Sequence, residues 1–254
     1  RAAGFDNVGL DLMFAIPGQT LDVWRATLDE ALALEPEHLS CYEVIYEEDT
    51  PLYAQLQANE FSVDEDLACT MYDELLDCAA SHGFSQYEIA NFARLESSAR
   101  TAIPPAALAD PDAIPTFACR HNVNYWRGGS FFGLGPSAAS YLNGVRTKNW
   151  PNTPLYCEQL ERGERPIEAR DELPPLQRAG EIAAFGLRMV AGWRFDEFHR
   201  ITGFDLRQEW RSEMQQVADQ EWGVLEPERF RLTRAGLRFA DTVAELFLRL
   251  PEPA

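Results

Sequence analysis

The sequence predicts an α/β protein followed by a helical C-terminal region. Over residues 7–90, apolar runs with strand character alternate with amphipathic helical segments. This alternation is typical of a parallel sheet or barrel. From Glu172 onward the apolar spacing is that of helices, interrupted by one short hairpin pattern. The chain is therefore expected to contain two structurally different parts.

The first strand and helix are predicted from an apolar run and a capping residue. Residues 7–15 form a continuous apolar run with one acid, which favours a strand covered on both faces. Thr20 is placed to cap a helix over 21–34, whose apolar residues share one face. Pro36 ends that helix, and residues 38–46 read as the next strand.

A second helical unit follows a short helix predicted over residues 52–56. Ser62 and Glu65 have capping-box spacing and predict the start of a long helix. Gly83 lies where the residue after a helix C-cap belongs. Residues 86–90 are then expected to form a short strand.

Residues 95–116 interrupt the pattern, because they are rich in Ser, Ala and Pro. A loop of this length is unusual inside a compact domain. It is either an insertion or functional; we favour a surface insertion, in which any helix around 106–109 is short. Residues 137–142 read as a short element, 155–162 as a short helix and 164–170 as a polar linker.

The C-terminal region has the order of a winged-helix-like module. Helices are predicted over 176–190, 195–201, 206–218 and, capped by Thr233, 236–250; a hairpin is predicted from 223–226 and 229–232. Its arginines are interleaved with acids, so we expect a packing or lid role rather than DNA binding.

Composition restricts the partners and the compartment. The formal net charge of −19 argues against general nucleic-acid binding. No apolar run reaches the roughly 20 residues that a membrane helix needs, so no stable membrane insertion is expected. The five cysteines are scattered without C-x-x-C spacing, which favours free thiols in a reducing compartment. We expect a cytoplasmic protein.

The segment Cys119–Trp126 carries the densest chemistry, and a glycine-rich run follows it. Within it, His121 could bind iron through a neutral imidazole, and the aromatic neighbours Tyr125 and Trp126 could form a flat apolar wall for a macrocycle. The alternative is a hydrogen-bonded structural histidine. The residues by themselves leave both readings open.

Asp11 is the second candidate, because it is an acid inside an apolar strand. A buried acid needs a partner, and barrel active sites lie at the carboxyl ends of strands. Contact with a ligand and satisfaction by loop amides are both open. The sequence contains no Ser/His/Asp set, phosphate-binding Walker loop, H-E-x-x-H motif or cysteine cluster.

Several ordered segments resemble radical SAM proteins akin to oxygen-independent coproporphyrinogen III oxidase. The strand and turn at 10–20 are similar to D-L-(I/M)-x-G-L-P-G-Q-T. The other matching segments are 86–93 (Q-Y-E-I-x-N-F-A), 119–126 (C-R-H-N-x-x-Y-W), 133–140 (G-L-G-x-x-A-x-S) and the tail around Leu232–Gly236.

The H-N-x-x-Y-W element is typical of the heme-chaperone branch, the HemW-like proteins. The resemblance implies heme binding by His121, Asn122, Tyr125 and Trp126. It also implies contacts to S-adenosylmethionine from Asp11 and, with weaker alignment, from Ile45 and Ala139. Cys119 lacks the spacing of an iron–sulfur ligand and is expected to be a bystander.

The family's C-x-x-x-C-x-x-C motif and its Gly-rich segment are absent from the sequence. In the family both lie upstream of the part that resembles this chain. We therefore expect a C-terminal portion: the second half of a partial (β/α) radical SAM barrel over 1–168, then a helical winged-helix-like domain over 169–254. The [4Fe–4S] cluster and S-adenosylmethionine would belong to the full-length protein, and this chain is not expected to be catalytic by itself.

The sequence leaves three functions open. The leading one is a heme chaperone that binds heme or porphyrin and passes heme to acceptor proteins. The alternative is oxidative decarboxylation of coproporphyrinogen III by the full-length protein. The third is an inactive remnant of the fold.

Overall fold

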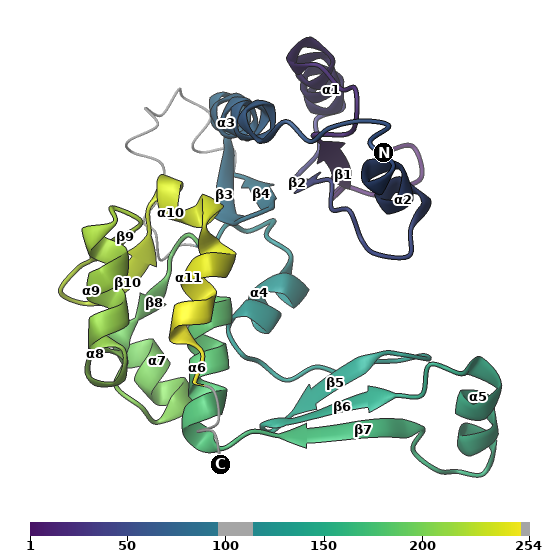
Figure 1. The fold of residues 1–254 in the computed structure, drawn as a ribbon, viewed down its shortest axis with the longest axis vertical. Helices are drawn as coiled ribbons and strands as arrows, with labels where there is room; N and C mark the ends of the chain where they lie inside the picture. Colours follow the sequence, from purple (N-terminus) through teal and green to yellow (C-terminus); the bar gives the residue numbers. More distant parts are fainter. Residues whose placement is uncertain (96–113, 250–254) are drawn as a thin grey trace. The chain divides into compact units, whose positions relative to one another are not determined.

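The computed structural model describes residues 1–95 and 114–249. The chain divides into two compact units, Arg1–Ala118 and Cys119–Ala254 (Figure 1). The predicted division at 168/169 rests on family resemblance and stays a prediction. The predicted insertion over 95–116 lies largely outside the described residues, and residues 106–109, where any helix was expected to be short, lie entirely outside them.

The first unit is built on a four-stranded sheet of order β1-β2-β4-β3. Its strands are β1 (Gly9–Phe14), β2 (His38–Glu43), β3 (Phe84–Glu88) and β4 (Asn91–Arg94). β1 and β2 are parallel, whereas β4 is antiparallel to both of its neighbours. The parallel pairing expected of the first two strands is confirmed, but β4 was not predicted, and it follows β3 after a two-residue connection that only an antiparallel pair allows.

Two helices, α1 (Leu21–Ala33) and α3 (Glu65–Ser81), enclose the core of this unit with one face of the sheet. The core contains Phe14, Trp24, Leu28, Leu39, Met71, Leu75, Phe84 and Phe92. Trp24 is fully buried, and its Nε1 donates a 2.9 Å hydrogen bond to the carbonyl oxygen of Met71. The bond satisfies a polar atom that burial would otherwise leave unpaired.

The helix ends confirm two expectations and correct one. Thr20 Oγ1 accepts a hydrogen bond from the backbone N–H of Val23, as predicted for a cap. Gly83 has a φ of +79°, directly after the C-cap of α3. The predicted capping box at Ser62 is wrong: Asp64 caps α3, because its Oδ1 accepts from the N–H of Leu67 at 2.9 Å. A short helix α2 (Pro51–Gln57) lies where it was expected.

β1 is buried on one face only. Leu10, Leu12 and Phe14 point toward the core, while Gly9, Asp11 and Met13 are exposed. The expectation of a strand covered on both faces is therefore wrong within the described residues.

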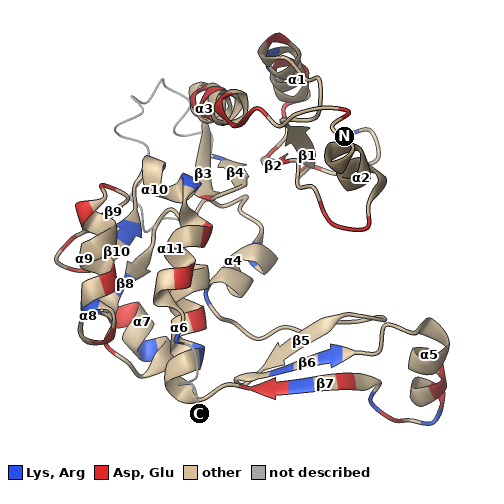
Figure 2. Cartoon of the chain, in the orientation of Figure 1, with Lys and Arg blue, Asp and Glu red and all other residues tan. Residues whose placement is uncertain are grey.

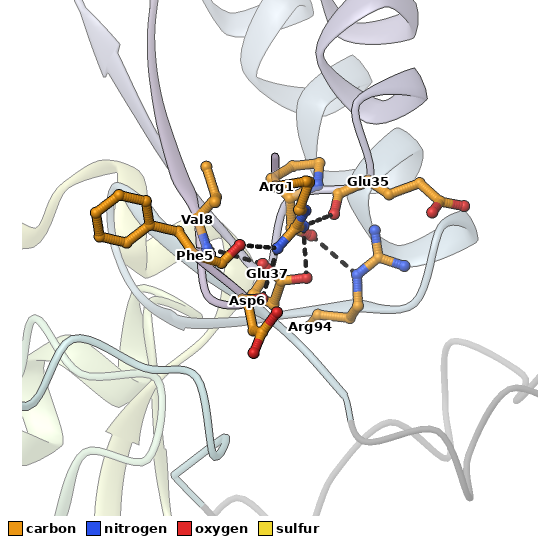
Figure 3. A network of polar contacts seen from close by, with 8 residues as sticks. Arg1, Phe5, Asp6, Val8, Glu35, Glu37 and Arg94 are labelled. Atoms are coloured by element: carbon orange, nitrogen blue, oxygen red, sulfur yellow. Dashed lines mark hydrogen bonds and ion pairs between the residues drawn. The ribbon is translucent and has the colours of Figure 1, made fainter. Parts of the chain in front are cut away.

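A polar network holds the connection between α1 and β2 (Figure 3). Arg1 Nη2 donates to the carbonyl oxygen of Glu35 at 2.6 Å and to the carboxylate of Glu37 at 2.8 Å. The other carboxylate oxygen of Glu37 accepts from the N–H of Val8 at 2.8 Å. The Nε of Arg94 donates to the carbonyl oxygen of Pro36 at 2.9 Å. Strand ends distant in sequence are thereby joined.

The second unit begins with α4 (Arg120–Trp126) and an antiparallel sheet of order β5-β6-β7. The sheet consists of β5 (Ala139–Leu142), β6 (Val145–Asn149) and β7 (Ile167–Glu172), with α5 (Thr153–Glu161) between the last two. The predicted linker over 164–170 is wrong, since most of it forms β7. Five of the six residues of β7 are exposed and four are charged, and Figure 2 shows acidic and basic residues along this strand. No apolar alternation therefore marks it as a strand.

Helices surround a second antiparallel sheet of order β8-β10-β9 in the C-terminal region. The predicted hairpin is confirmed by the pairing of β9 (Gly223–Leu225) with β10 (Arg229–Leu232); β8 (Trp193–Arg194) adds a third strand. The helices are α6 (Pro175–Gly186), α7 (Phe195–Thr202), α8 (Leu206–Glu209), α9 (Arg211–Asp219), α10 (Arg234–Arg238) and α11 (Ala240–Phe247). Two predicted helices are thus each divided, at Trp210 and at Phe239.

No helix in the described part of the chain is long and apolar enough to cross a membrane.

Candidate functional site

The H-N-x-x-Y-W element lies on the short helix α4, which begins after Cys119. Gly128, with a φ of +72°, turns the chain out of the helix. The adjacent Arg127 anchors this end: its Nη1 donates to the carbonyl oxygen of Gly192 at 2.6 Å, and its Cζ lies 4.7 Å from the ring centroid of Trp193. α4 is therefore held on the helical part of its own unit.

His121 and Tyr125 lie one turn apart on α4, so their side chains share a helix face. His121 is exposed, and within the described residues its ring makes no hydrogen bond or ion pair. The reading of a hydrogen-bonded structural histidine therefore has no contact to support it. An exposed imidazole without a partner can bind a metal through either nitrogen.

Aromatic side chains surround Tyr125. Its ring centroid lies 5.1 Å from that of Phe131, 5.2 Å from that of Trp126 and 6.0 Å from that of Phe185. Tyr125 remains 36% exposed. The cluster thus presents a supported aromatic surface on the helix that carries His121. Phe131 and Phe185 were not predicted as site residues. The i, i+4 spacing within α4 gives no information about contacts with residues outside the helix.

Asn122 has a local role in the helix. Its Oδ1 accepts a hydrogen bond from the thiol of Cys119 at 3.5 Å. The side chain of Asn124, two residues on, donates to the carbonyl oxygen of Ser130 at 3.0 Å. Both amides hold the chain around α4, on which His121 is exposed.

The glycine-rich loop after α4 is tightly held. The N–H of Gly133 donates to Ser140 Oγ at 2.9 Å, and Asn149 Nδ2 donates to the carbonyl oxygen of Gly135 at 2.9 Å. A Cβ on Gly133 would collide with the backbone of Ala139. The side chain of Leu134, between Gly133 and Gly135, is 88% exposed. Ala139, a predicted cofactor contact, is exposed at the start of β5.

Asp11 lies in the first unit, in the middle of β1. The prediction that it is buried is wrong, because its side chain is on the uncovered face of the sheet. Asp11 pairs with Ser40 on β2, and Ser40 pairs with Asn91 on β4, so the three residues form one row across the sheet. Ser40 and Asn91 are buried. Ile45, the other predicted cofactor contact of this unit, follows β2 and is 73% exposed.

Asn91 and Glu88 form a buried polar pair at the edge of this row. The side-chain amide of Asn91 donates to the Glu88 carboxylate, which also accepts from the N–H of Ala90 at 3.1 Å. Asn91 Oδ1 is buried and has no hydrogen-bond partner in the described residues. The pair therefore leaves one buried oxygen acceptor unpaired, whereas Asp11 in the same row is exposed.

Two titratable groups near Asp11 are perturbed. Burial, followed by the nearby charge of Asp11, raises the pKa of the Cys41 thiol to about 12. Burial lowers the pKa of His38, while the charge of Asp11 opposes that shift. The ring of His38 is hydrogen-bonded through Nε2 to the hydroxyl of Tyr87 at 2.8 Å. Neither group therefore resembles a free nucleophile or metal ligand.

An iron–sulfur cluster does not fit the residues present. All five cysteines are free, and the described residues contain no group of three His, Cys, Asp or Glu side chains that could hold a metal ion. With C-x-x-x-C-x-x-C absent from the sequence as well, no step of radical chemistry can be assigned to this chain.

The structure brings some of the predicted residues together and leaves others apart. His121, Asn122, Tyr125 and Trp126 share α4 in the second unit, which also contains Ala139. Asp11 and Ile45 belong to the first unit. The four residues predicted to bind heme thus lie on one short helix, and the expected cofactor contacts are divided between the units.

The curated relatives of this chain include proteins named heme chaperone HemW. No family model matches the chain. It is 25% identical to the heme chaperone HemW of Lactococcus lactis subsp. lactis (strain IL1403) over 252 residues, 98% of this chain and 60% of that protein. It is 31% identical to the heme chaperone HemW of Bacillus subtilis (strain 168) over 193 residues, 76% of this chain and 46% of that protein.

The chain is HemW-like in sequence. It spans about half the length of the curated relatives it matches, which fits the predicted correspondence to a C-terminal portion. The structure of the radical SAM enzyme coproporphyrinogen III oxidase, HemN, from Escherichia coli is similar with a TM-score of 0.69, over 97% of this chain and 56% of that one. At 14% identity this likeness shows the fold alone.

Proposed function

We propose that this HemW-like chain carries the heme-binding surface of a heme chaperone and that the full-length protein passes heme to acceptor proteins. The observation that supports this most directly is the exposed, unpartnered imidazole of His121 beside the aromatic surface of Tyr125. Imidazole supplies an axial ligand for heme iron, and an apolar surface favours the flat macrocycle. The names of the relatives support the same function.

The finer architecture and the cofactor contacts are part of the proposal. We assign residues 1–168 to a partial (β/α) barrel and residues 169–254 to a winged-helix-like domain. Asp11, Ile45 and Ala139 would contact S-adenosylmethionine in the full-length protein, with Asp11 accepting hydrogen bonds from the ribose. The [4Fe–4S] cluster would require ligands that this chain lacks.

Compartment and partners follow from chemistry. The five free cysteines support a reducing compartment such as the cytoplasm. In the wing, Arg229 and Arg231 both pair with Glu226, which leaves little free positive charge there for nucleic acid. We propose heme and heme-acceptor proteins as the partners.

A heme titration followed by absorption spectroscopy tests the function. The parent chain should bind heme with the spectrum of a histidine-ligated iron. His121→Ala should weaken binding at least about tenfold, which corresponds to about 1.4 kcal/mol, and should change that spectrum. Equal affinity of the parent and of His121→Ala would overturn the assignment.

Two control variants make the titration specific. His199→Ala removes another exposed histidine, on α7, and should leave heme affinity unchanged. Cys119→Ser removes the thiol nearest to α4 and should also leave the spectrum unchanged. A spectral change in Cys119→Ser alone would instead identify a thiolate ligand.

A further inference from the structure

The side chains of Arg188 and Trp126 are stacked in the second unit. Arg188 follows α6, and its Cζ lies 5.1 Å from the centroid of the Trp126 ring. One guanidinium nitrogen, Nη1, binds the carboxylate of Asp241 on α11. The guanidinium is thus fixed by a ring on one side and by a carboxylate at one edge.

Both side chains retain a hydrogen-bond donor with no acceptor. Arg188 Nε and Trp126 Nε1 are buried and have no partner in the described residues. Buried side-chain donors are nearly always paired, and leaving one unpaired costs about 1–3 kcal/mol. Two unpaired donors on stacked side chains indicate that an acceptor from outside this part of the chain completes the site.

We propose that Arg188 and Trp126 bind a carboxylate of the tetrapyrrole that α4 carries. This inference rests on the proposed heme function and deepens it. Heme bears two propionate side chains on its rim, and these are its charged groups. A propionate would accept from the Nε edge of Arg188 and from the indole N–H of Trp126.

The chemistry of the two residues suits a carboxylate. A guanidinium presents two parallel N–H donors along its Nε edge, which match the two oxygens of a carboxylate. Asp241, already bound at the Nη1 side, is 88% exposed, so solvent screens its repulsion of a second carboxylate. The side chain of Arg188 is 25% exposed, so the site lies near the surface.

The test compares heme with its dimethyl ester, in which both propionates have lost their charge. The parent should bind free-acid heme about 10-fold more tightly than the ester, as expected for a charge-assisted hydrogen bond. Arg188→Met should lose most of that preference, while its spectrum still shows histidine ligation. Trp126→Phe keeps the stacked ring and removes only the N–H, so it should lose a smaller part.

Matched variants separate this effect from a general loss of charge or of folding. Arg170→Met removes an arginine that is 63% exposed on β7, and it should keep the full preference for the free acid. Arg188→Lys keeps the charge but not the two-donor edge, and it should lose most of the preference. Circular dichroism establishes that each variant is folded.

The outcomes distinguish the two proposals. Equal binding of both heme forms by the parent, or full preference in folded Arg188→Met and Arg188→Lys, would overturn the carboxylate site while leaving the heme function intact. Failure of the parent to bind either form would overturn the heme function and the carboxylate site together.

Discussion

The aromatic ring of Tyr125 on α4 packs against that of Phe131, with 5.1 Å between ring centroids. Further contacts to Trp126 and Phe185 fix the ring from other sides. No hydrogen bond fixes the hydroxyl of Tyr125 in the described residues. The side chain therefore supports the proposed heme surface through its ring.

Two substitutions test whether the ring or the hydroxyl of Tyr125 acts. Tyr125→Phe keeps the aromatic face and should bind heme as tightly as the parent. Tyr125→Ala removes that face and should bind heme about tenfold more weakly, because a lost aromatic contact costs roughly 1 kcal/mol or more. Heme titration measures both. Equal losses in the two variants would show that the hydroxyl contacts heme.

Cys41 should be the least reactive thiol of the chain. It is buried in β2, and burial followed by the charge of Asp11 raises its pKa to about 12. The nucleophilic thiolate is therefore negligible at neutral pH. Brief exposure to a maleimide, read by peptide mass spectrometry, should label the exposed Cys69 and Cys157 and leave Cys41 unlabelled until denaturant is added. Labelling of Cys41 at the rate of Cys69 would mean that the core between the sheet and the helices α1 and α3 opens readily.

Helix ends that depend only on neighbouring residues were predicted correctly from the sequence. Thr20 and Gly83 mark helix ends because a hydroxyl cap and a left-handed backbone depend on neighbouring residues only. The choice of Ser62 over Asp64 failed because both side chains can cap, and the backbone decided between them. β7 could not be recognised, since its exposed residues carry no alternation.

Only those residues of the candidate site that are close together in the sequence were predicted. His121, Tyr125 and Trp126 are neighbours in the chain, so the motif brought them together. Arg188 lies more than sixty residues away by number and reaches Trp126 only through the packing of the second unit. No spacing rule connects such a pair. The antiparallel placement of β4 likewise depends on a non-local pairing with β2.

Trp210 should contribute strongly to the stability of the helical region. It is fully buried between α8 and α9, and its Nε1 donates a 2.8 Å hydrogen bond to the carbonyl oxygen of Phe247, at the end of α11. Trp210→Phe removes this bond and leaves a void, so the free energy of unfolding should fall by about 2–4 kcal/mol. Urea denaturation measures it.

Trp222→Phe is the matched control for that measurement. Trp222 is partly exposed and stacks on Phe239 with centroids 4.4 Å apart, a contact that phenylalanine can keep. Its unfolding free energy should fall by less than about 1.5 kcal/mol. Equal losses in the two variants would mean that the bond from Trp210 to Phe247 adds nothing.

Asp205 should make the stability of the helical region depend on acid pH. It caps α8 through the N–H of Arg207 at 2.9 Å, and its hydrogen bond to the Arg207 guanidinium is the main cause of its lowered pKa. A carboxyl whose pKa is lower in the folded than in the unfolded protein stabilises the fold above its ordinary value of about 3.9, and this stabilisation is lost as the pH falls through the folded pKa. Asp205→Asn keeps a capping oxygen but not the charge. Its free energy of unfolding should therefore be slightly lower than that of the parent at neutral pH, and this difference should vanish in acid. Asp205→Ala also loses the cap and should cost about 1 kcal/mol at neutral pH. Urea denaturation at neutral and acid pH measures both, and a deficit of Asp205→Asn that grows in acid would contradict the assigned direction of the shift.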